Sequence, residues 1–226
     1  MSATVSISGA RESRQRILGK IRSATDQSGN RPGECSETYG ALPRTYVRKG
    51  SLAPDARIAL MVERLREYDA EVIECAPALL VASIDAQLGA SGKHCFVAPE
   101  GLPADWLVAG IDWKIDRELS TEEIEAVEGV VTAAFCGIAD SGTIVLHHSP
   151  AEGRRVITLL PDWHLCILRA SQVVETLPEY FDRCATPADL VTWISGPSAT
   201  ADIEMTRIKG VHGPRFLHVI LVRDEI

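Results

Sequence analysis

The sequence lacks the cysteine spacing that structural zinc and iron–sulfur sites require. No two of its six cysteines lie within four residues of each other, so it contains no CxxC motif. Such sites need close pairs, because a single turn must present two thiolates to one ion. Cys136 and Cys166 lie in apolar runs and are interpreted as core residues. We therefore expect no metal and no cofactor in this chain, and a reducing compartment.

Two further absences limit the partners of the protein. No uninterrupted apolar stretch approaches the ~18 residues that a membrane-spanning helix needs, and the first residues lack the pattern of a signal peptide. The net charge is −8 and no Lys/Arg cluster is longer than a pair, whereas nucleic-acid-binding domains usually carry a basic surface. We expect a cytoplasmic protein that binds neither a membrane nor nucleic acid.

The composition and periodicity that remain are typical of one α/β domain with an N-terminal extension. The chain has 226 residues, of which 46% are hydrophobic and 24% are charged, as in a globular protein. Residues 13–24 have helical periodicity, and the Gly-, Pro- and Ser-rich stretch that follows predicts a long flexible arm. We therefore divide the chain into residues 1–50, a helix and an arm, and residues 51–226, the α/β domain.

Helical and strand-like segments alternate along the predicted domain. Helices are expected at 55–70, 76–92, 120–127, 171–184 and 200–210, and strands at 71–75, 93–99, 113–117, 129–139, 140–146, 154–161, 164–170, 189–195 and 216–224. Alternation of helices with apolar, β-branched strands favours a three-layer α/β fold, in which a mostly parallel sheet is flanked by helices.

The decapeptide SGPSATADIE at residues 195–204 is the first candidate ligand-binding loop. Gly196 and Pro197 favour a sharp bend, and small polar residues follow that can cap the helix expected at 200–210. Free N–H groups at a helix N-terminus favour an anion, and ligands of open α/β sheets bind at the carboxyl ends of the strands. The loop therefore predicts either an anion or carboxylate cradle or only a turn. Its candidate side chains are Ser198, Thr200, Asp202 and Glu204.

Two more loops carry polar residues beside turn-forming glycines. Asp140 and Thr143 could hydrogen-bond a ligand, or Asp140 could close an Asx turn. His212 lies between Gly210 and Gly213. It is a candidate proton carrier, because the unperturbed pKa of histidine is about 6.5, and it could equally be a residue that packs the loop.

Adjacent histidines and adjacent arginines give weaker signals. His147 and His148 would point to opposite faces of a strand, which disfavours a shared metal ion. Arg154 and Arg155 could pair with a carboxylate substrate, although a solvated turn is the preferred interpretation.

Four motifs, in this order and at this spacing, resemble the lactate-utilisation protein C family, whose members contain the LUD domain. They are GIADSGTIVL, GRRVITLLPDWHLCIL, SGPSATADIE and GVHGPRFLHVIL, and the resemblance covers about residues 50–226. It implies a NagB/RpiA/CoA-transferase-like α/β fold and a place in a bacterial system that oxidises L-lactate to pyruvate. It also implies partner subunits that carry iron–sulfur clusters, which agrees with the absence of CxxC here.

The resemblance leaves three functions open. The preferred one is a non-redox subunit of the lactate-oxidising system, which binds its iron–sulfur partners and a small ligand bearing a carboxylate or a phosphate. The second is a free-standing enzyme of the phosphosugar-isomerase or CoA-transferase type, although no nucleophile motif or Lys-bearing phosphate loop supports it. The third is a regulatory or scaffold protein. If a site exists, we expect Asp202 or Glu204 as acceptor or base, Thr143 and Ser198 as donors, and His212 as proton carrier.

Overall fold

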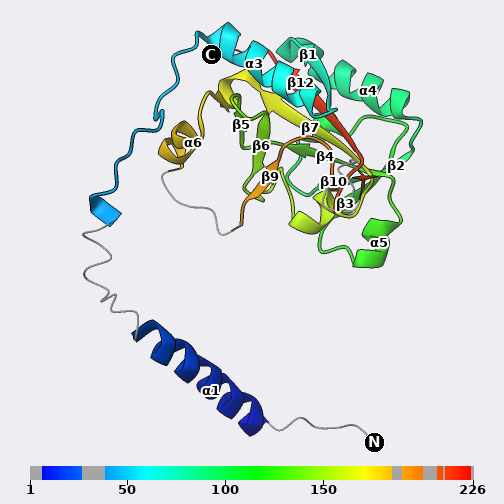
Figure 1. Ribbon diagram of the computed structural model, residues 1–226. Helices are drawn as coiled ribbons and strands as arrows, with labels where there is room; N and C mark the ends of the chain where they lie inside the picture. The colour runs from blue at the N-terminus through cyan, green and yellow to red at the C-terminus, as the bar shows by residue number, and fades with distance from the viewer. Residues whose placement is uncertain (1–6, 27–38, 185–189, 201–207, 211, 225–226) are drawn as a thin grey trace, which may run out of the picture. The chain divides into compact units, whose positions relative to one another are not determined.

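A computed structural model describes residues 7–26, 39–184, 190–200, 208–210 and 212–224 of the protein (Figure 1). The chain divides into two compact units, Met1–Tyr46 and Val47–Ile226. The first contains helix α1 (Ile7–Asp26), which is longer than the helix expected at 13–24. The apolar side chains of Ile17 and Ile21 on this helix are exposed. Among the described residues, no helix combines the length and the apolar character needed to cross a membrane.

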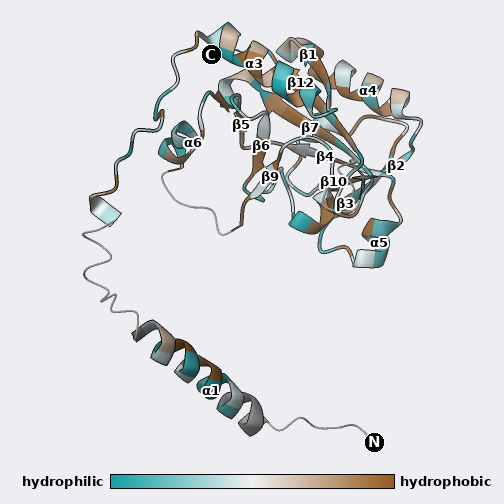
Figure 2. Cartoon of the chain, viewed as in Figure 1, coloured by the Kyte–Doolittle hydropathy of each residue, from teal (hydrophilic) through white to brown (hydrophobic). Residues whose placement is uncertain are grey.

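The second unit is built on a six-stranded sheet in which every neighbouring pair of strands is parallel. Its strands, in spatial order, are β1 (Glu71–Cys75), β12 (Phe216–Val222), β7 (Trp163–Arg169), β4 (Gly129–Ala133), β2 (Cys95–Pro99) and β3 (Asp112–Asp116). Figure 2 shows the central strand β7 in the colour of hydrophobic residues along most of its length. A strand buried on both faces needs such a continuous apolar run. The predicted α/β fold with a mostly parallel sheet is confirmed.

Helices cover both faces of this sheet. Helix α3 (Pro54–Glu67) packs on one face and helix α4 (Leu80–Ser91) packs on the other. Because successive side chains of a strand point to opposite faces, Cys166 and Leu168 of β7 contribute to the cluster with α3, whereas Leu165 belongs to the cluster with α4. Helix α5 (Thr121–Glu125) starts with a capping box, in which the Ser120 side chain accepts a hydrogen bond from the Glu123 N–H.

A second sheet, which the sequence did not predict, lies on the α3 side of the first. It consists of β8 (Val173–Val174), β5 (Cys136–Ile138), β6 (Thr143–Leu146) and β9 (Thr192–Ile194), with antiparallel β5–β6 and β6–β9 pairs. Ile144 and Leu146 of β6 belong to the core shared with α3 and the large sheet. Val145, between them, faces Tyr180 of helix α6 (Leu177–Arg183). The apolar run at 129–139 therefore serves two sheets, because the chain leaves the first after Ala133.

Three expected elements are wrong in part or in whole. Residues 154–161 contain a 3-10 helix, η3 (Arg155–Thr158), because Ile157 packs into a separate core beside Ile124 and overrides the strand preference of its β-branched neighbours. The helix expected at 171–184 is instead strand β8 followed by helix α6, and the third element is the helix expected at 200–210.

The other 3-10 helices of the described residues are η1 (Pro77–Leu79), η2 (Ala104–Trp106) and η4 (Ala170–Gln172).

The helix expected at 200–210 is contradicted at both of its ends. Strand β10 (Ala199–Thr200) pairs antiparallel with β11 (Ile208–Lys209), and residues 201–207 lie outside the described residues. Gly210 has a φ of +85° and its N–H donates to the Ser198 carbonyl at 2.9 Å, so it extends the pairing of the hairpin instead of closing a helix.

The shared core predicts a large difference between two identical substitutions. Leu146→Ala removes a fully buried side chain between the two sheets, and we expect it to lower the free energy of unfolding by about 2–5 kcal/mol. Leu79→Ala removes a side chain that is 57% exposed and should cost less than about 1 kcal/mol. Urea unfolding followed by circular dichroism measures both values. Similar losses for the two variants would contradict a core that joins the sheets.

Candidate functional site

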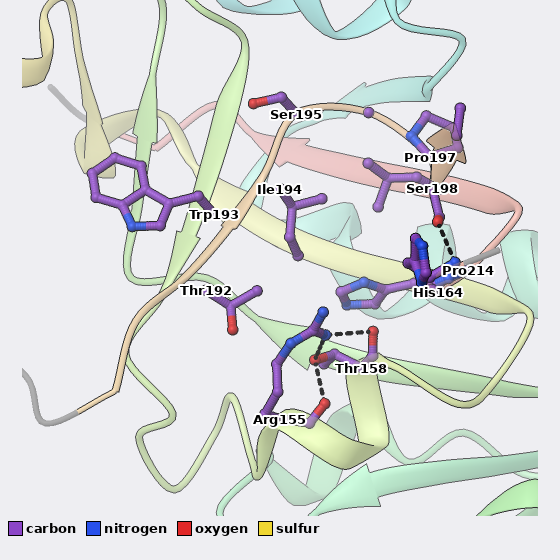
Figure 3. A pocket seen from close by; sticks show the side chains of 15 residues that line it. Arg155, Thr158, His164, Thr192, Trp193, Ile194, Ser195, Pro197, Ser198 and Pro214 are labelled. Atoms are coloured by element: carbon purple, nitrogen blue, oxygen red, sulfur yellow. Dashed lines mark hydrogen bonds between the residues drawn. The ribbon is translucent and has the colours of Figure 1, made fainter. Parts of the chain in front are cut away.

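A cavity of about 260 Å³ lies between the second sheet and the amino ends of two central strands of the large sheet (Figure 3). His164 and Leu217 line it from the second positions of β7 and β12, and Thr192, Trp193 and Ile194 of β9 form the opposite wall. The expected position, at the carboxyl ends of the strands, is therefore not where this cavity lies.

The loops that contain Ser198 and His212 meet at this cavity. The Ser198 N–H donates to the Pro214 carbonyl at 2.9 Å, and the Ser198 hydroxyl accepts from the His212 N–H at 3.1 Å. Ser198 thus ties two loops together, and it caps no helix because the chain continues as β10. Gly196, with a φ of +82°, packs so closely on Tyr68 that a Cβ atom would lie 2.5 Å from the Tyr68 Cβ. Its turn therefore requires glycine.

The other predicted residues are placed elsewhere or are not described. Asp140 is exposed in the turn between β5 and β6, where its N–H donates to the Glu175 carbonyl at 3.0 Å, and it does not line the cavity. The Thr143 hydroxyl lies 2.8 Å from the hydroxyl of Ser195, so it touches the cavity only through that residue. The side chain of Thr200 and the whole of Asp202 and Glu204 lie outside the described residues.

Arg155 is the charged residue of the cavity that the preferred interpretation of the sequence missed. Its side chain is half-buried, and its Nη1 donates to the carbonyl and the hydroxyl of Thr158 at 3.1 and 3.2 Å. Burial lowers the pKa of Arg155, but a guanidinium stays charged in proteins. Arg154 behaves differently, because its Nε donates to the buried carboxylate of Asp116 at 2.9 Å. The sequence shows the two adjacent arginines but does not distinguish them. Only the contacts in the structure show that Arg154 is paired with an acid and that Arg155 has no acid partner among the described residues.

His164 supplies the second polar group of the cavity, although its place in an apolar run predicts only a strand residue. It is 1% exposed, and its Nε2 lies 2.8 Å from the hydroxyl of the fully buried Thr132. Burial, with a smaller contribution from the charge of Arg155, lowers the pKa of His164 to about 3. The imidazole is therefore neutral at physiological pH and can serve as a hydrogen-bonding group without adding charge.

The described lining of the cavity favours an anion. It contains one guanidinium, the neutral imidazole of His164, and the hydroxyls of threonines and serines, and it contains no Asp or Glu. Among the described residues there is also no group of three His, Cys, Asp or Glu side chains that could hold a metal ion. A half-buried cation without a neighbouring acid attracts small anions, because its charge is only partly screened by water.

These features define an α/β protein in which a small, mostly antiparallel sheet packs on a parallel sheet and a cavity lined by one guanidinium lies between them. The family model of the LUD domain matches residues 93–222. The chain belongs to the LUD-domain family. The match spans all strands of the large sheet except β1 and includes every residue of the cavity described above.

Relatives and a solved structure agree with this assignment. Lactate utilization protein C of Deinococcus radiodurans is 38% identical over 164 residues, which cover 71% of this chain and 76% of that protein. Lactate utilization protein C of Bacillus subtilis is 26% identical over 239 residues, covering 96% and 99%. The crystal structure of a DUF162 family protein from D. radiodurans superimposes with a TM-score of 0.64 at 31% identity, covering 76% of this chain and 99% of that one.

The buried neutral imidazole predicts a specific dependence of stability on pH. An unfolded histidine takes up a proton below about pH 6.5, whereas native His164, with a pKa of about 3, does not. The contribution of His164 to the free energy of unfolding is therefore complete above pH 6.5. It falls as the pH decreases toward 3, by about 1.4 kcal/mol per pH unit. His164→Gln should make the decline of the unfolding free energy between pH 6 and 4 shallower by that amount.

Urea unfolding at a series of pH values measures this slope. The control is His94→Gln, which makes the same substitution at an exposed histidine outside the core. Parallel curves for wild type and His164→Gln would show that His164 is not held neutral.

Proposed function

We propose that this chain is the non-redox component of a system that oxidises L-lactate to pyruvate, acting with partner proteins that carry iron–sulfur clusters. The observation that carries the proposal is the 38% identity, over 71% of this chain, to a protein named lactate utilization protein C. The anion-favouring cavity supports it, because lactate and pyruvate are both small anions.

The state of the cysteines supports the assignment of electron transfer to partners. Burial raises the pKa of Cys136 to about 11 and that of Cys166 to about 12, so both are protonated thiols at neutral pH. Cluster ligands are thiolates presented together by closely spaced residues. Buried thiols on separate strands of two different sheets do not fit that requirement.

The size of the cavity bears on the alternative of a CoA-transferase or phosphosugar isomerase. Its volume of about 260 Å³ lies below the roughly 300–1,000 Å³ of pockets that hold drug-sized ligands. A molecule with the few heavy atoms of lactate fits, whereas coenzyme A is many times larger. This size favours lactate over coenzyme A as the ligand of the cavity.

Deletion of the gene from its host tests the proposal. We expect the deletion strain to lose growth on L-lactate as the sole carbon source and to keep growth on pyruvate, because only the oxidation step is missing. A plasmid copy should restore growth. The affinity-tagged chain should also copurify with proteins that show the visible absorption of iron–sulfur clusters. Undiminished growth of the deletion strain on L-lactate would contradict the proposal.

A further inference from the structure

We propose that the cavity under β9 binds a small 2-hydroxy- or 2-oxo-monocarboxylate, with the guanidinium of Arg155 as the anchor of its carboxylate. The inference deepens the proposed function and rests on it for the 2-hydroxy or 2-oxo group. The choice of a carboxylate, and of Arg155 as its partner, depends on local contacts alone.

The available hydrogen-bond donors of Arg155 are the first argument. Its Nη1 donates to the carbonyl and the hydroxyl of Thr158, while Nε and Nη2 have no partner among the described residues. Several other arginines of the domain pair with acids: Arg64 with Glu67, Arg117 with Glu100, Arg154 with Asp116, Arg215 with Asp162 and Arg223 with Glu74. Arg66 and Arg183 donate to backbone carbonyls, but neither lines this cavity. The Nε–Nη2 edge of a guanidinium matches the two oxygens of a carboxylate, so this edge is suited to bidentate binding.

The walls of the cavity provide the rest of the recognition. The Arg155 guanidinium points toward His164 (Figure 3), whose Nδ1 has no partner among the described residues and could bond to a hydroxyl or oxo oxygen. Ile194 and Leu217 supply an apolar wall for a methyl group. A carboxylate, an adjacent oxygen and a short apolar tail are the three parts of the proposed ligand.

The loop geometry favours a carboxylate over a phosphate. Phosphate sites usually use several free backbone N–H groups at a helix N-terminus or in a glycine-rich loop. Here the N–H groups of Ser198, Gly210 and His212 are already bonded within the loops, and β10 replaces the expected helix. One guanidinium with neutral partners is adequate for a single negative charge, and the described lining contains no lysine.

Calorimetric titration of the purified full-length chain with pyruvate, L-lactate, acetate and inorganic phosphate tests this site. We expect pyruvate or L-lactate to bind more tightly than acetate, and phosphate to bind most weakly. Arg155→Gln should weaken binding roughly tenfold to a hundredfold, because a charge-assisted hydrogen-bonded pair is lost. Arg155→Lys should keep part of the affinity, since lysine retains the positive charge but lacks the paired N–H donors of the guanidinium. The matched control is Arg117→Gln, which removes an exposed arginine outside the cavity and should bind as wild type.

A second measurement does not depend on the folding of a variant. In NMR spectra of the wild-type chain, the Arg155 Nε–H signal should shift during titration with pyruvate, while that of Arg117 should stay in place. Phosphate binding as tight as that of pyruvate, an unmoved Arg155 signal, or equal affinity of wild type and Arg155→Gln would each overturn the inference.

The outcomes separate this inference from the proposed function. If the deletion strain grows on L-lactate while pyruvate still binds at Arg155, the proposed function fails and the carboxylate site stands. If growth requires the chain but none of the carboxylates binds, the site fails and the place in lactate oxidation stands.

Discussion

The packing of the small sheet on one face of the large sheet is the constraint on which the rest of the structure depends. Along β7, the side chains that face the small sheet are His164, Cys166 and Leu168, in order from the amino end. Cys166 and Leu168 meet Ile144 and Leu146 in a closed core. The core therefore fills the carboxyl half of the interface between the sheets, and the amino half, which begins at His164, stays open as the cavity.

This packing explains why the cavity departs from the usual position in open α/β sheets. Ligands commonly bind beyond the carboxyl ends of the strands, where loops converge at the reversal of strand order. In this protein the chain leaves the carboxyl end of β4 directly into β5, and that of β7 into η4 and β8. Those ends are thus occupied by the connections that build the second sheet. The described loop residues that line the cavity come instead from the stretches that follow β9 and precede β12.

The sequence predicted the large sheet well and the cavity only in part, for a physical reason. Parallel strands are buried on both faces, so β7 and β12 appear as continuous apolar runs that are recognisable locally. The strands of the small sheet are two to four residues long, and apart from the β5–β6 hairpin their pairing partners are distant in sequence. Ser198 and His212 were found through their turn residues, whereas Asp140 has the same local pattern but a different location. No local signal in the sequence distinguishes Arg155 from Arg154. The two differ only because Arg154 pairs with Asp116, which is distant in sequence.

The pairing of Arg154 with Asp116 also determines what Arg155 can do. The Asp116 side chain is 3% exposed and lies at the end of β3, so the Arg154 fork fixes the start of η3 to the large sheet. The first residue of η3 is then held at the cavity, where its guanidinium has lost part of its water without gaining an acid among the described residues. A charge kept in that condition is costly unless something pairs with it. The anionic ligand that we propose would remove this cost, so that its binding would also stabilise the start of η3.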